Sequence, residues 1–488
     1  MTLMSKFSLL PEEVIVEALE NVDFKTIISC QLTSRDLKAV VAHSMSLRYK
    51  LALAAVGMCD GLYRSLSTVE GLERLRTYQS NFGVSPWIKR EVLPLFTALP
   101  SNDIVSGALL AHPLPNRPGF ALHQMPSVLR GIKERRWEID VGSKFRVVCM
   151  DSSQDLLVQV EDASRAQPLS CFHLRSLSTG EVHPSSRSNG TIPMGHQPAR
   201  IGMTSVYGDY LAKVLLHSVS ASLPTDRQVL CIWNWRTGVV ELEQPLQPLS
   251  GRDWPTFAFL DERRIVVLQG SLSGTLHPLS LQVFEFRTNT SHATDCRASQ
   301  PSHIFWLPQF EKTAPVKVGI MPSRPTTGQQ SRGHFYSDPA DQLLATQMTF
   351  TQPHRDFALY VPTRTLLALM RALPTTSNGT PVTVPWGVWG PSGSRLEEIR
   401  PRSEPVPSVL ISGMRTLSLV HDACDDSRKL LVSDYHPRRS LMWDEDGPWR
   451  LAADEVDVEA QPFSMTSSLP CFVKEIPLPK ELSLVQDE

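Results

Sequence analysis

The sequence predicts an α+β, multidomain protein: a small N-terminal bundle of helices followed by a mainly antiparallel β domain. With 488 residues, the chain is longer than one compact core usually needs. Apolar side chains recur at helical spacing up to about Phe82, whereas short β-branched runs alternate with turns from about Trp137 onward. The expected units are a helical module (1–46), a helical linker (47–85), an irregular connector (86–136) and a β domain (137–488).

Composition excludes several classes of partner. Hydrophobic residues make up 41% of the chain and charged residues 20%, which is typical of a water-soluble globular protein. The 48 basic and 50 acidic side chains give a formal charge of −2, so no global field attracts nucleic acid or anionic lipid. We therefore expect neither a nucleic-acid partner nor a membrane partner.

The N-terminus has too short an apolar stretch for a signal peptide, and apolar runs such as Leu51 to Met58 are too short to span a bilayer. The protein is expected in the cytosol or the nucleus. Its eight cysteines are scattered without paired short spacing, which favours buried reduced thiols over a zinc site or a redox couple.

The first predicted helix runs from Pro11 to about Glu20. Proline suits a helix start because its missing N–H has no partner there, and the two glutamates that follow complement the helix dipole. Ile15 and Leu19 recur at i and i+4 and define an apolar face. Asp23 and Ser34 are plausible N-caps for two further short helices.

Three helices of this size bury little surface. Some of their apolar side chains must stay exposed unless a partner covers them, namely those among Leu10, Ile15, Leu19, Ile28 and Leu32. The module therefore implies a docking surface. The alternative is that these helices simply cap one end of a larger domain.

Several segments of this module resemble the F-box family over roughly Ser8 to Ser46. They are Leu10-Pro11-Glu12-Glu13-Val14, Ile27-Ile28-Ser29-Cys30-Gln31-Leu32 and Ser34-Arg35-Asp36-Leu37, and the pattern departs from the family at Thr33 and Asp36. In that family the box binds the Skp-type adaptor of a cullin-RING ubiquitin ligase. The resemblance implies that role for six residues: Leu10, Pro11, Ile15, Leu19, Ile28 and Leu32.

Two further helices are predicted at Ser46 to Met58 and at Thr68 to Phe82. The segments 47–53, 57–61 and 70–75 resemble the linker in a group of fungal F-box proteins, and later segments at 336–344, 361–367 and 384–391 resemble the same group. Prolines are frequent from Pro86 to Gly131, which predicts an irregular connector containing a first strand or two.

Beyond the connector the sequence repeats itself. The turn Ser178-Thr179-Gly180 recurs as Arg236-Thr237-Gly238, 58 residues later, after the aromatic run Cys231-Ile232-Trp233-Asn234-Trp235. This spacing favours one four-stranded blade per repeat, and the segment 259–264 is similar to the start of another blade. An antiparallel β-propeller is therefore the first choice, with paired β-sandwiches as the alternative.

No phosphate loop, dinucleotide fingerprint, HExxH helix or nucleophile elbow is present, so we expect no enzyme and no cofactor. The acid pairs at 397–398 and 425–426 and the mixed-charge segment 133–137 are interpreted as solvated surface. His173, His217 and His421 are interpreted as core or rim residues, not metal ligands. The four tryptophans Trp233, Trp235, Trp386 and Trp389 are expected in blade cores.

The resulting hypothesis is an adaptor: the F-box docks on a Skp-type adaptor and through it a cullin, while the β domain holds a target protein. Two alternatives remain, a ligase-independent scaffold and a propeller enzyme whose site is built from unrelated loops. Exposure of Leu10, Ile15 and Leu19 distinguishes the first two, because a scaffold would bury these residues against the β domain.

Overall fold

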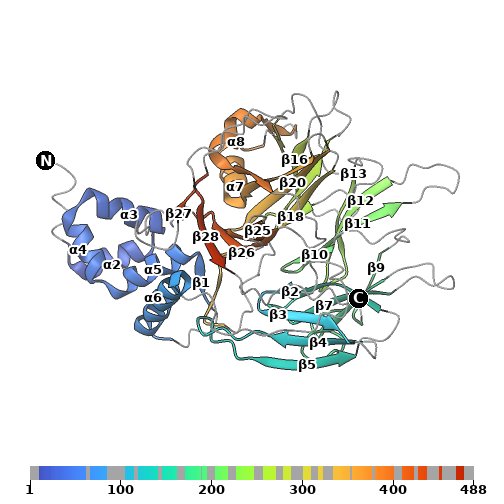
Figure 1. Cartoon of the computed structure of the whole chain (residues 1–488), viewed down its shortest axis with the longest axis horizontal. Helices are drawn as coiled ribbons and strands as arrows, with labels where there is room; N and C mark the ends of the chain where they lie inside the picture. Colours follow the sequence, from blue (N-terminus) through green and yellow to red (C-terminus); the bar gives the residue numbers. More distant parts are fainter. Residues whose placement is uncertain are drawn as a thin grey trace.

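The computed structural model describes most of the chain between residues 10 and 477. The described ranges are 10–61, 66–84, 105–114, 119–140, 145–161, 171–187, 189–194, 204–217, 227–246, 257–270, 279–286, 300–308, 317–322, 333–351, 354–375, 380–399, 409–422, 427–436, 450–452 and 469–477. The N-terminal helices project from one side of a ring of β-sheets (Figure 1).

Three short helices form the N-terminal module: α2 (Glu12–Glu20), α3 (Phe24–Thr33) and α4 (Arg35–His43). The two predicted N-caps are confirmed. Asp23 accepts a 2.8 Å hydrogen bond from the backbone N–H of Thr26, and Ser34 accepts one of 3.4 Å from Leu37. Each cap satisfies a backbone donor that the first helical turn leaves free.

The linker consists of α5 (Met45–Val56), β1 (Met58–Asp60) and α6 (Thr68–Val84). Both predicted helices are therefore confirmed. Gly57 ends α5 in the left-handed conformation, with a φ of 66°, which favours glycine. The strand β1 was not predicted, because it forms only by pairing with β19 (Phe335–Ser337), far away in the sequence.

The β domain is a propeller of antiparallel sheets, as predicted, and it has six blades, a number that the sequence did not predict. Its first three blades are continuous four-stranded meanders. Blade 1 is β2 (Val105–Ser106), β3 (Leu109–Pro113), β4 (Gly119–Gln124) and β5 (Arg135–Asp140); blade 2 is β6 (Phe145–Asp151), β7 (Leu156–Glu161), β8 (Cys171–Ser176) and β9 (Thr191–Pro193); blade 3 is β10 (Thr204–Tyr207), β11 (Tyr210–His217), β12 (Arg227–Asn234) and β13 (Val240–Leu246).

The last three blades carry insertions. Blade 4 is β14 (Phe257–Phe259), β15 (Arg264–Gln269), β16 (Ser280–Glu285) and β17 (His303–Trp306); blade 5 is β18 (Lys317–Pro322), β20 (Leu343–Thr351), β21 (His354–Pro362) and β23 (Arg395–Ile399); blade 6 is β24 (Val409–Ser412), β25 (Arg415–Asp422), β26 (Ser427–Asp434), β28 (Phe472–Pro477) and β27 (Arg450–Leu451). Between β21 and β23 lie α7 (Thr363–Ala372), β22 (Val382–Val384) and α8 (Trp386–Gly393), and β22 pairs with β17.

One backbone hydrogen bond recurs in all six blades. The carbonyl in the turn between the first two strands accepts from the residue that follows the third strand, at 2.7 to 2.9 Å. The pairs, donor first, are Met125 with Ala108, Leu177 with Asp155, Trp235 with Asp209, Phe286 with Arg263, Thr363 with Gln342 and Tyr435 with Met414. The repeat detected in the sequence, at 178–182 and 236–240, begins one residue after two of these donors, at the connection between the third and fourth strands.

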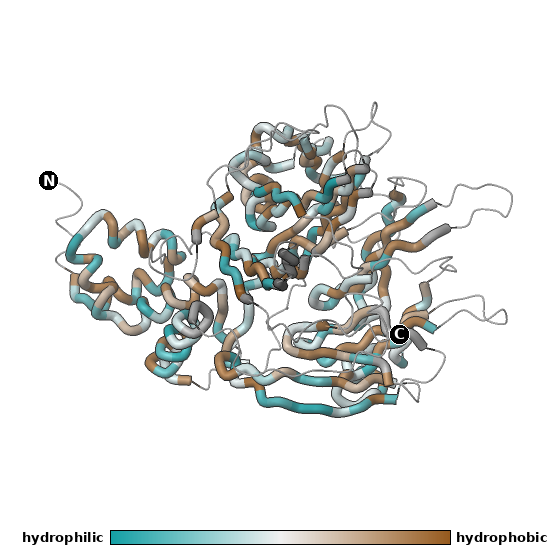
Figure 2. The backbone as a smooth tube through the Cα atoms, in the orientation of Figure 1, coloured by the Kyte–Doolittle hydropathy of each residue, from teal (hydrophilic) through white to brown (hydrophobic). Residues whose placement is uncertain are grey.

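Apolar clusters fill the spaces between neighbouring blades. Clusters of buried side chains join blades 1 and 2, 2 and 3, 3 and 4, 4 and 5, and 5 and 6. The first strands lie beside one another, as β2 beside β6 and β6 beside β10, and so face the centre of the ring. The outermost strand β5 is largely hydrophilic (Figure 2).

The predicted connector needs a correction. Its described part, from residue 105, is nearly all of blade 1, and the predicted boundary at Trp137 falls inside β5. Two of the prolines that suggested irregular structure fall in the described part, both near strand ends: Pro113 ends β3, and Pro126 follows β4. Proline is tolerated there because no interior ladder hydrogen bond is lost. The first part of the connector, 86–104, lies outside the described residues.

Candidate partner-docking site

The structure separates the six predicted docking residues into two groups. Leu10 and Leu32 are exposed, at 43% and 82% of their surface, Pro11 is exposed and Ile28 is half-buried. Ile15 and Leu19 are each only 7% exposed. The prediction that these two contact a partner directly is therefore corrected.

The buried pair forms the core of the module itself. Ile15 and Leu19 pack with Ile27, Val41 and Leu47, all from α2 to α5, and the cluster contains no residue of the propeller. The periodicity of α2 correctly indicated an apolar face. It could not show that α4 and α5 cover that face, because helical spacing is local and packing is not.

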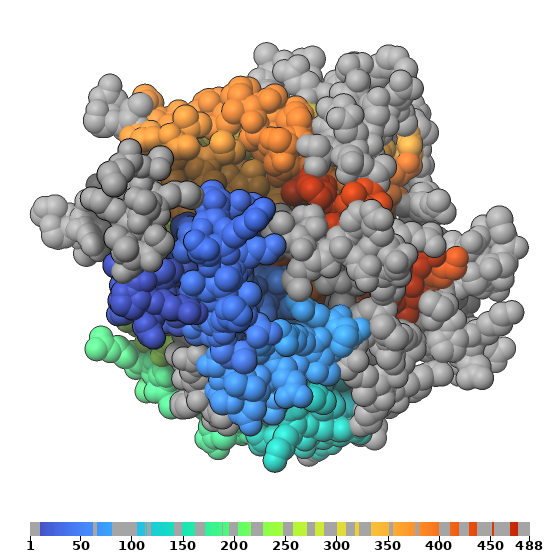
Figure 3. All heavy atoms as spheres, turned by 90° about the vertical axis from the view of Figure 1, so that its left-hand side faces the viewer, coloured from blue at the N-terminus to red at the C-terminus, as the bar shows by residue number. Residues whose placement is uncertain are grey.

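What remains on the surface is an apolar side of α2 and α3. Ile28 and Leu32, four residues apart, lie on one side of α3, whereas Val14 lies on α2 and Leu10 just before its N-cap, Pro11. Val14, 45% exposed, was not among the predicted residues, although it lies three positions after Pro11 in the F-box pattern. Figure 3 views the molecule from this end, with the helices in front of the propeller.

Helix α5 belongs to two cores at once. Leu47 packs in the core of the module, whereas Tyr49 and Val56 pack against Leu72 and Leu75 of α6. In addition, the Lys50 ammonium donates hydrogen bonds of 2.6 and 2.5 Å to the carbonyls of Glu20 and Val22, at the end of α2. Because lysine cations stabilise the carbonyl end of a helix, α2 and α5 are held together by charge as well as by packing.

The linker in turn is attached to the propeller by a strand pair. In β1 and β19, Met58, Cys59 and Asp60 lie opposite Ser337, Tyr336 and Phe335. The Gly61 N–H donates to the His334 carbonyl at 2.8 Å, and the Asp338 N–H donates to the Gly57 carbonyl at 2.9 Å. The docking end and the propeller therefore form one continuous structure.

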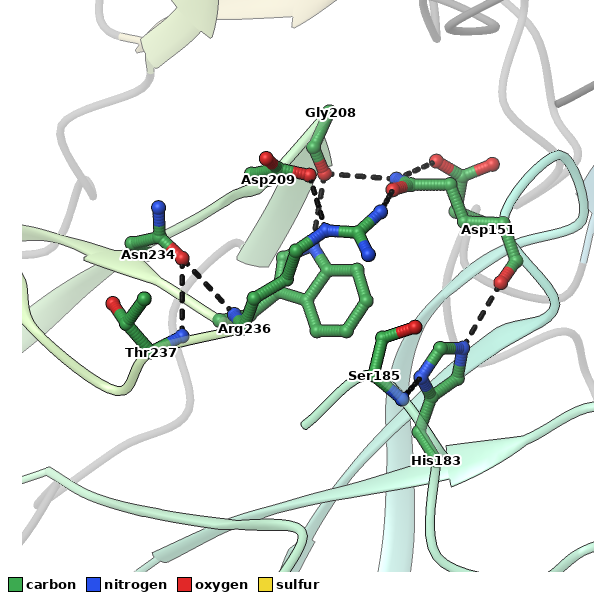
Figure 4. Close-up of polar contacts among 10 residues, drawn as sticks. Asp151, His183, Ser185, Gly208, Asp209, Asn234, Arg236 and Thr237 are labelled. Carbon is green, nitrogen blue, oxygen red and sulfur yellow. Dashed lines mark hydrogen bonds and ion pairs between the residues drawn. The ribbon is translucent and has the colours of Figure 1, made fainter. Parts of the chain in front are cut away.

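A polar cluster joins blades 2 and 3 (Figure 4). The Arg236 guanidinium contacts Asp209 at 2.5 Å, and the Gly208 carbonyl accepts from the Trp235 indole and from Gln154, each at 2.8 Å. His183 lies edge-on to the Trp235 ring at 4.9 Å between centroids.

The imidazole in this cluster is oriented from both sides. Its Nδ1 accepts from the Ser185 N–H at 3.2 Å, so its Nε2 carries the proton that is donated to the Gln154 carbonyl at 3.0 Å. Both ring nitrogens of His183 are thus engaged in hydrogen bonds to the backbone, which fix the orientation of the imidazole. The cluster therefore fastens two blades together.

The described tryptophans and acidic residues that were site candidates pack or form ion pairs within the protein. Trp233, Trp235 and Trp389 are buried in blade cores, as expected, and Trp386 packs edge-on against Trp389. Glu397 and Glu398 pair with different arginines, Arg395 and Arg355. The pair at 425–426 and the side chains of His217 and His421 lie outside the described residues.

Within the described ranges, no group of three histidine, cysteine, aspartate or glutamate side chains is placed to hold a metal ion. His173 lies 3.7 Å from Glu161, and burial lowers its pKa despite that neighbouring carboxylate. No helix in the described part of the chain is long and apolar enough to cross a membrane.

Comparison with protein families identifies the N-terminal module. The F-box domain family matches residues 7–49. No curated protein matches the chain. Among solved structures, the chain is similar to the β-propeller domain of the Trilobed protease from Pyrococcus furiosus, with 9% identity, 77% of this chain and 95% of that chain covered and a TM-score of 0.31. The chain thus carries an F-box domain at its N-terminus, followed by a six-bladed β-propeller.

Proposed function

We propose that this protein is a non-enzymatic substrate-recognition adaptor of a Skp–cullin–F-box ubiquitin ligase, acting in the cytosol or the nucleus. The F-box would bind the Skp-type adaptor and through it the cullin, and the propeller would bind a target protein. The observation that carries the proposal is the exposed apolar side of α2 and α3 in a module whose own core is already complete.

Single exposed leucines are common, but five apolar side chains at the surface of one small module are not. Leu10 and Pro11 precede α2, Val14 lies on α2, and Ile28 and Leu32 lie on α3. Covering them would remove apolar surface from water without disturbing Ile15 or Leu19. We assign the partner contact to these five residues and a supporting role to the buried pair.

The mechanism is geometric. Helix α5 packs on the F-box module with some of its side chains and on α6 with others. A target held by the propeller therefore has a restricted position relative to the ligase. Restricting that position raises the effective concentration of target lysines near the ubiquitin-charged enzyme. No acid, base or nucleophile on this chain is needed for such a role.

The position of the linker also suggests where a target binds. The linker contacts connections between first and second strands and between third and fourth strands, as at His334 and Leu129. In an antiparallel blade these connections lie at one end of the strands. We therefore assign the target to the opposite face of the propeller.

The relation to the fungal group of F-box proteins is part of the same proposal. It is supported by the segments of the linker and of the propeller that resemble this group.

The test is a binding measurement with purified full-length chain and a purified Skp-family adaptor. Wild type is expected to bind, and both the Leu10→Ala, Pro11→Ala double variant and Leu32→Ser are expected to lose at least about tenfold in affinity. Val239→Ser is the matched control, because Val239 is also exposed but lies on blade 3. Failure of wild type to bind would overturn the proposal and leave a ligase-independent scaffold.

A further inference from the structure

Within the described ranges, blade 6 and blade 1 are the one pair of neighbouring blades that neither a shared strand nor an apolar cluster joins. Each of these blades is built from its own stretch of chain, and no described strand of one pairs with a strand of the other. Apolar clusters join each of the five remaining pairs of neighbouring blades, but among the described residues none joins this pair. On blade 6, Val432 and Phe472 form a small cluster with residues of that blade alone.

The linker contacts the blades on both sides of this seam. On blade 1, the Arg74 guanidinium donates a 3.2 Å hydrogen bond to the Val128 carbonyl, and Leu129 packs into the apolar cluster around Leu75. On blade 6, the Arg415 guanidinium donates a 2.8 Å hydrogen bond to the Tyr78 hydroxyl. One helix, α6, therefore connects the first and last blades.

Blade 5 adds a second connection, between itself, blade 1 and the linker. The loop that carries β19 reaches blade 1, where the His334 N–H donates to the Arg130 carbonyl at 2.8 Å and the Arg130 guanidinium donates to the Ser337 hydroxyl at 3.3 Å. The same loop pairs with β1 of the linker, and Phe335 is buried in the cluster around Leu75. Blade 1, blade 5 and the linker meet in one junction.

The linker also leaves no space at blade 6. A Cβ built on Gly57 would lie 3.2 Å from two ring atoms of His436, so this stretch of backbone rests directly on the imidazole. His436 in turn bonds Asp341 of blade 5 at 3.0 Å, and both side chains are buried. Packing this close transmits displacement, because no gap absorbs it.

We propose that the linker, made of α5, β1 and α6, is the clasp that closes the propeller ring between blades 6 and 1. A closed ring in which neighbouring blades pack on each other needs a fastening where the first and last blades meet, and among the described residues it is the helical linker that contacts both. The linker that joins the F-box module to the propeller therefore also holds the propeller ring closed. The inference does not depend on what the F-box binds.

The test is hydrogen exchange on the full-length chain with Leu75→Ala, which removes a fully buried side chain from the junction. Exchange is expected to rise about tenfold or more in β4 and β5 of blade 1 and in β26 and β28 of blade 6, and to stay unchanged in β11 and β12 of blade 3. Tyr78→Phe should give a smaller rise in the same strands. Val69→Ala is the control, because Val69 lies on the same helix but is 57% exposed.

A rise confined to α5, α6, β1 and β19 would show that the linker is only an appendage and would overturn the proposal, as would an equal rise in all six blades. If Leu75→Ala does not fold, Tyr78→Phe and Gly57→Ala decide the question by the same readout. Leu32→Ser separates the two proposals, because it should abolish adaptor binding and leave exchange in blades 1 and 6 as in wild type.

Discussion

Tyr78 and Arg415 are 337 positions apart in the sequence, yet the tyrosine oxygen accepts a 2.8 Å hydrogen bond from the arginine guanidinium. Arg415 also pairs with Asp434 at 3.0 Å, and that carboxylate is almost fully buried. The linker thus completes the hydrogen bonding of a charged pair in the last blade. A guanidinium donor left without its acceptor in such a place is costly.

Removing the hydroxyl from this contact should therefore lower stability. Tyr78→Phe is expected to reduce the free energy of unfolding by about 1–3 kcal/mol, since a bond to a charged donor is lost. Chemical denaturation measures this loss. The double variant Tyr78→Phe, Arg415→Lys should lose less than the sum of the two single changes, and strict additivity would show that the two side chains are not coupled.

The buried and exposed members of the F-box module should respond differently to truncation. Ile15→Ala or Leu19→Ala is expected to cost about 2–4 kcal/mol, because each leaves a cavity in a core made only of α2 to α5. Leu32→Ala should change stability by less than about 0.5 kcal/mol. Thermal unfolding of the three variants checks this. Equal losses at Leu32 and Ile15 would contradict the assignment of core and surface.

Gly71 should not tolerate a methyl group although it lies in a helix. Alanine there would gain up to about 1 kcal/mol of helix propensity. However, its Cβ would lie 2.7 Å from the Tyr49 ring, which is buried and held by a hydrogen bond to Asp60. Overpacking of this kind costs about 1–3 kcal/mol, so Gly71→Ala is expected to destabilise the protein.

The matched control for this variant is Gly387→Ala. Gly387 also lies in a helix, α8, but a Cβ there would meet nothing within 4 Å. The stability of the Gly387→Ala variant should therefore equal that of wild type or be slightly higher. If both variants gain stability in chemical denaturation, the close packing of α5 on α6 is not as tight as the structure shows.

The thiol of Cys59 reports on the junction between β1 and β19. Burial raises its pKa to about 11, and the charge of Asp338 adds to the effect. When the junction opens, the pKa should return toward about 8.5, so alkylation at pH 8.5 should quicken by up to about a hundredfold. In Leu75→Ala, mass spectrometry should show faster labelling of Cys59 but not of Cys231, whose pKa burial raises to about 12 in blade 3.

Mild acid should weaken the same junction. Burial lowers the pKa of His334, and the charge of Arg74 lowers it further. An unfolded histidine titrates near pH 6.5, so the unfolded state takes up its proton first as pH falls. The stability contributed by the neutral ring is therefore present above about pH 6.5 and lost as pH falls through that value toward the folded pKa.

This pH dependence can be measured as the free energy of unfolding between pH 8 and pH 5.5. His334→Asn should flatten the decline relative to wild type, with pH 8 as the baseline because the ring is neutral there in both states. A decline that is identical in wild type and variant would exclude His334 as its source.

Much of the fold follows from local patterns. Helical spacing, the caps at Asp23 and Ser34 and the proline before α2 were readable because each depends on neighbours within four residues. The central strands of blades 2 to 6 were readable for a similar reason, since strands buried on both faces are continuously apolar. Those of blade 1 fell within the predicted connector. Short edge strands such as β9 and β27 were missed, because two or three residues carry too little pattern.

The sequence by itself therefore determined the F-box module, the strand content and the repeat that indicates blades. Only the tertiary structure decided that Ile15 and Leu19 are core, that blade 1 begins at residue 105, and that the linker bridges the first and last blades. The physical reason is the sequence separation of the residues that make each kind of contact. Periodicity and capping report contacts within one element, whereas burial, strand pairing such as β1 with β19 and ring closure depend on residues hundreds of positions apart.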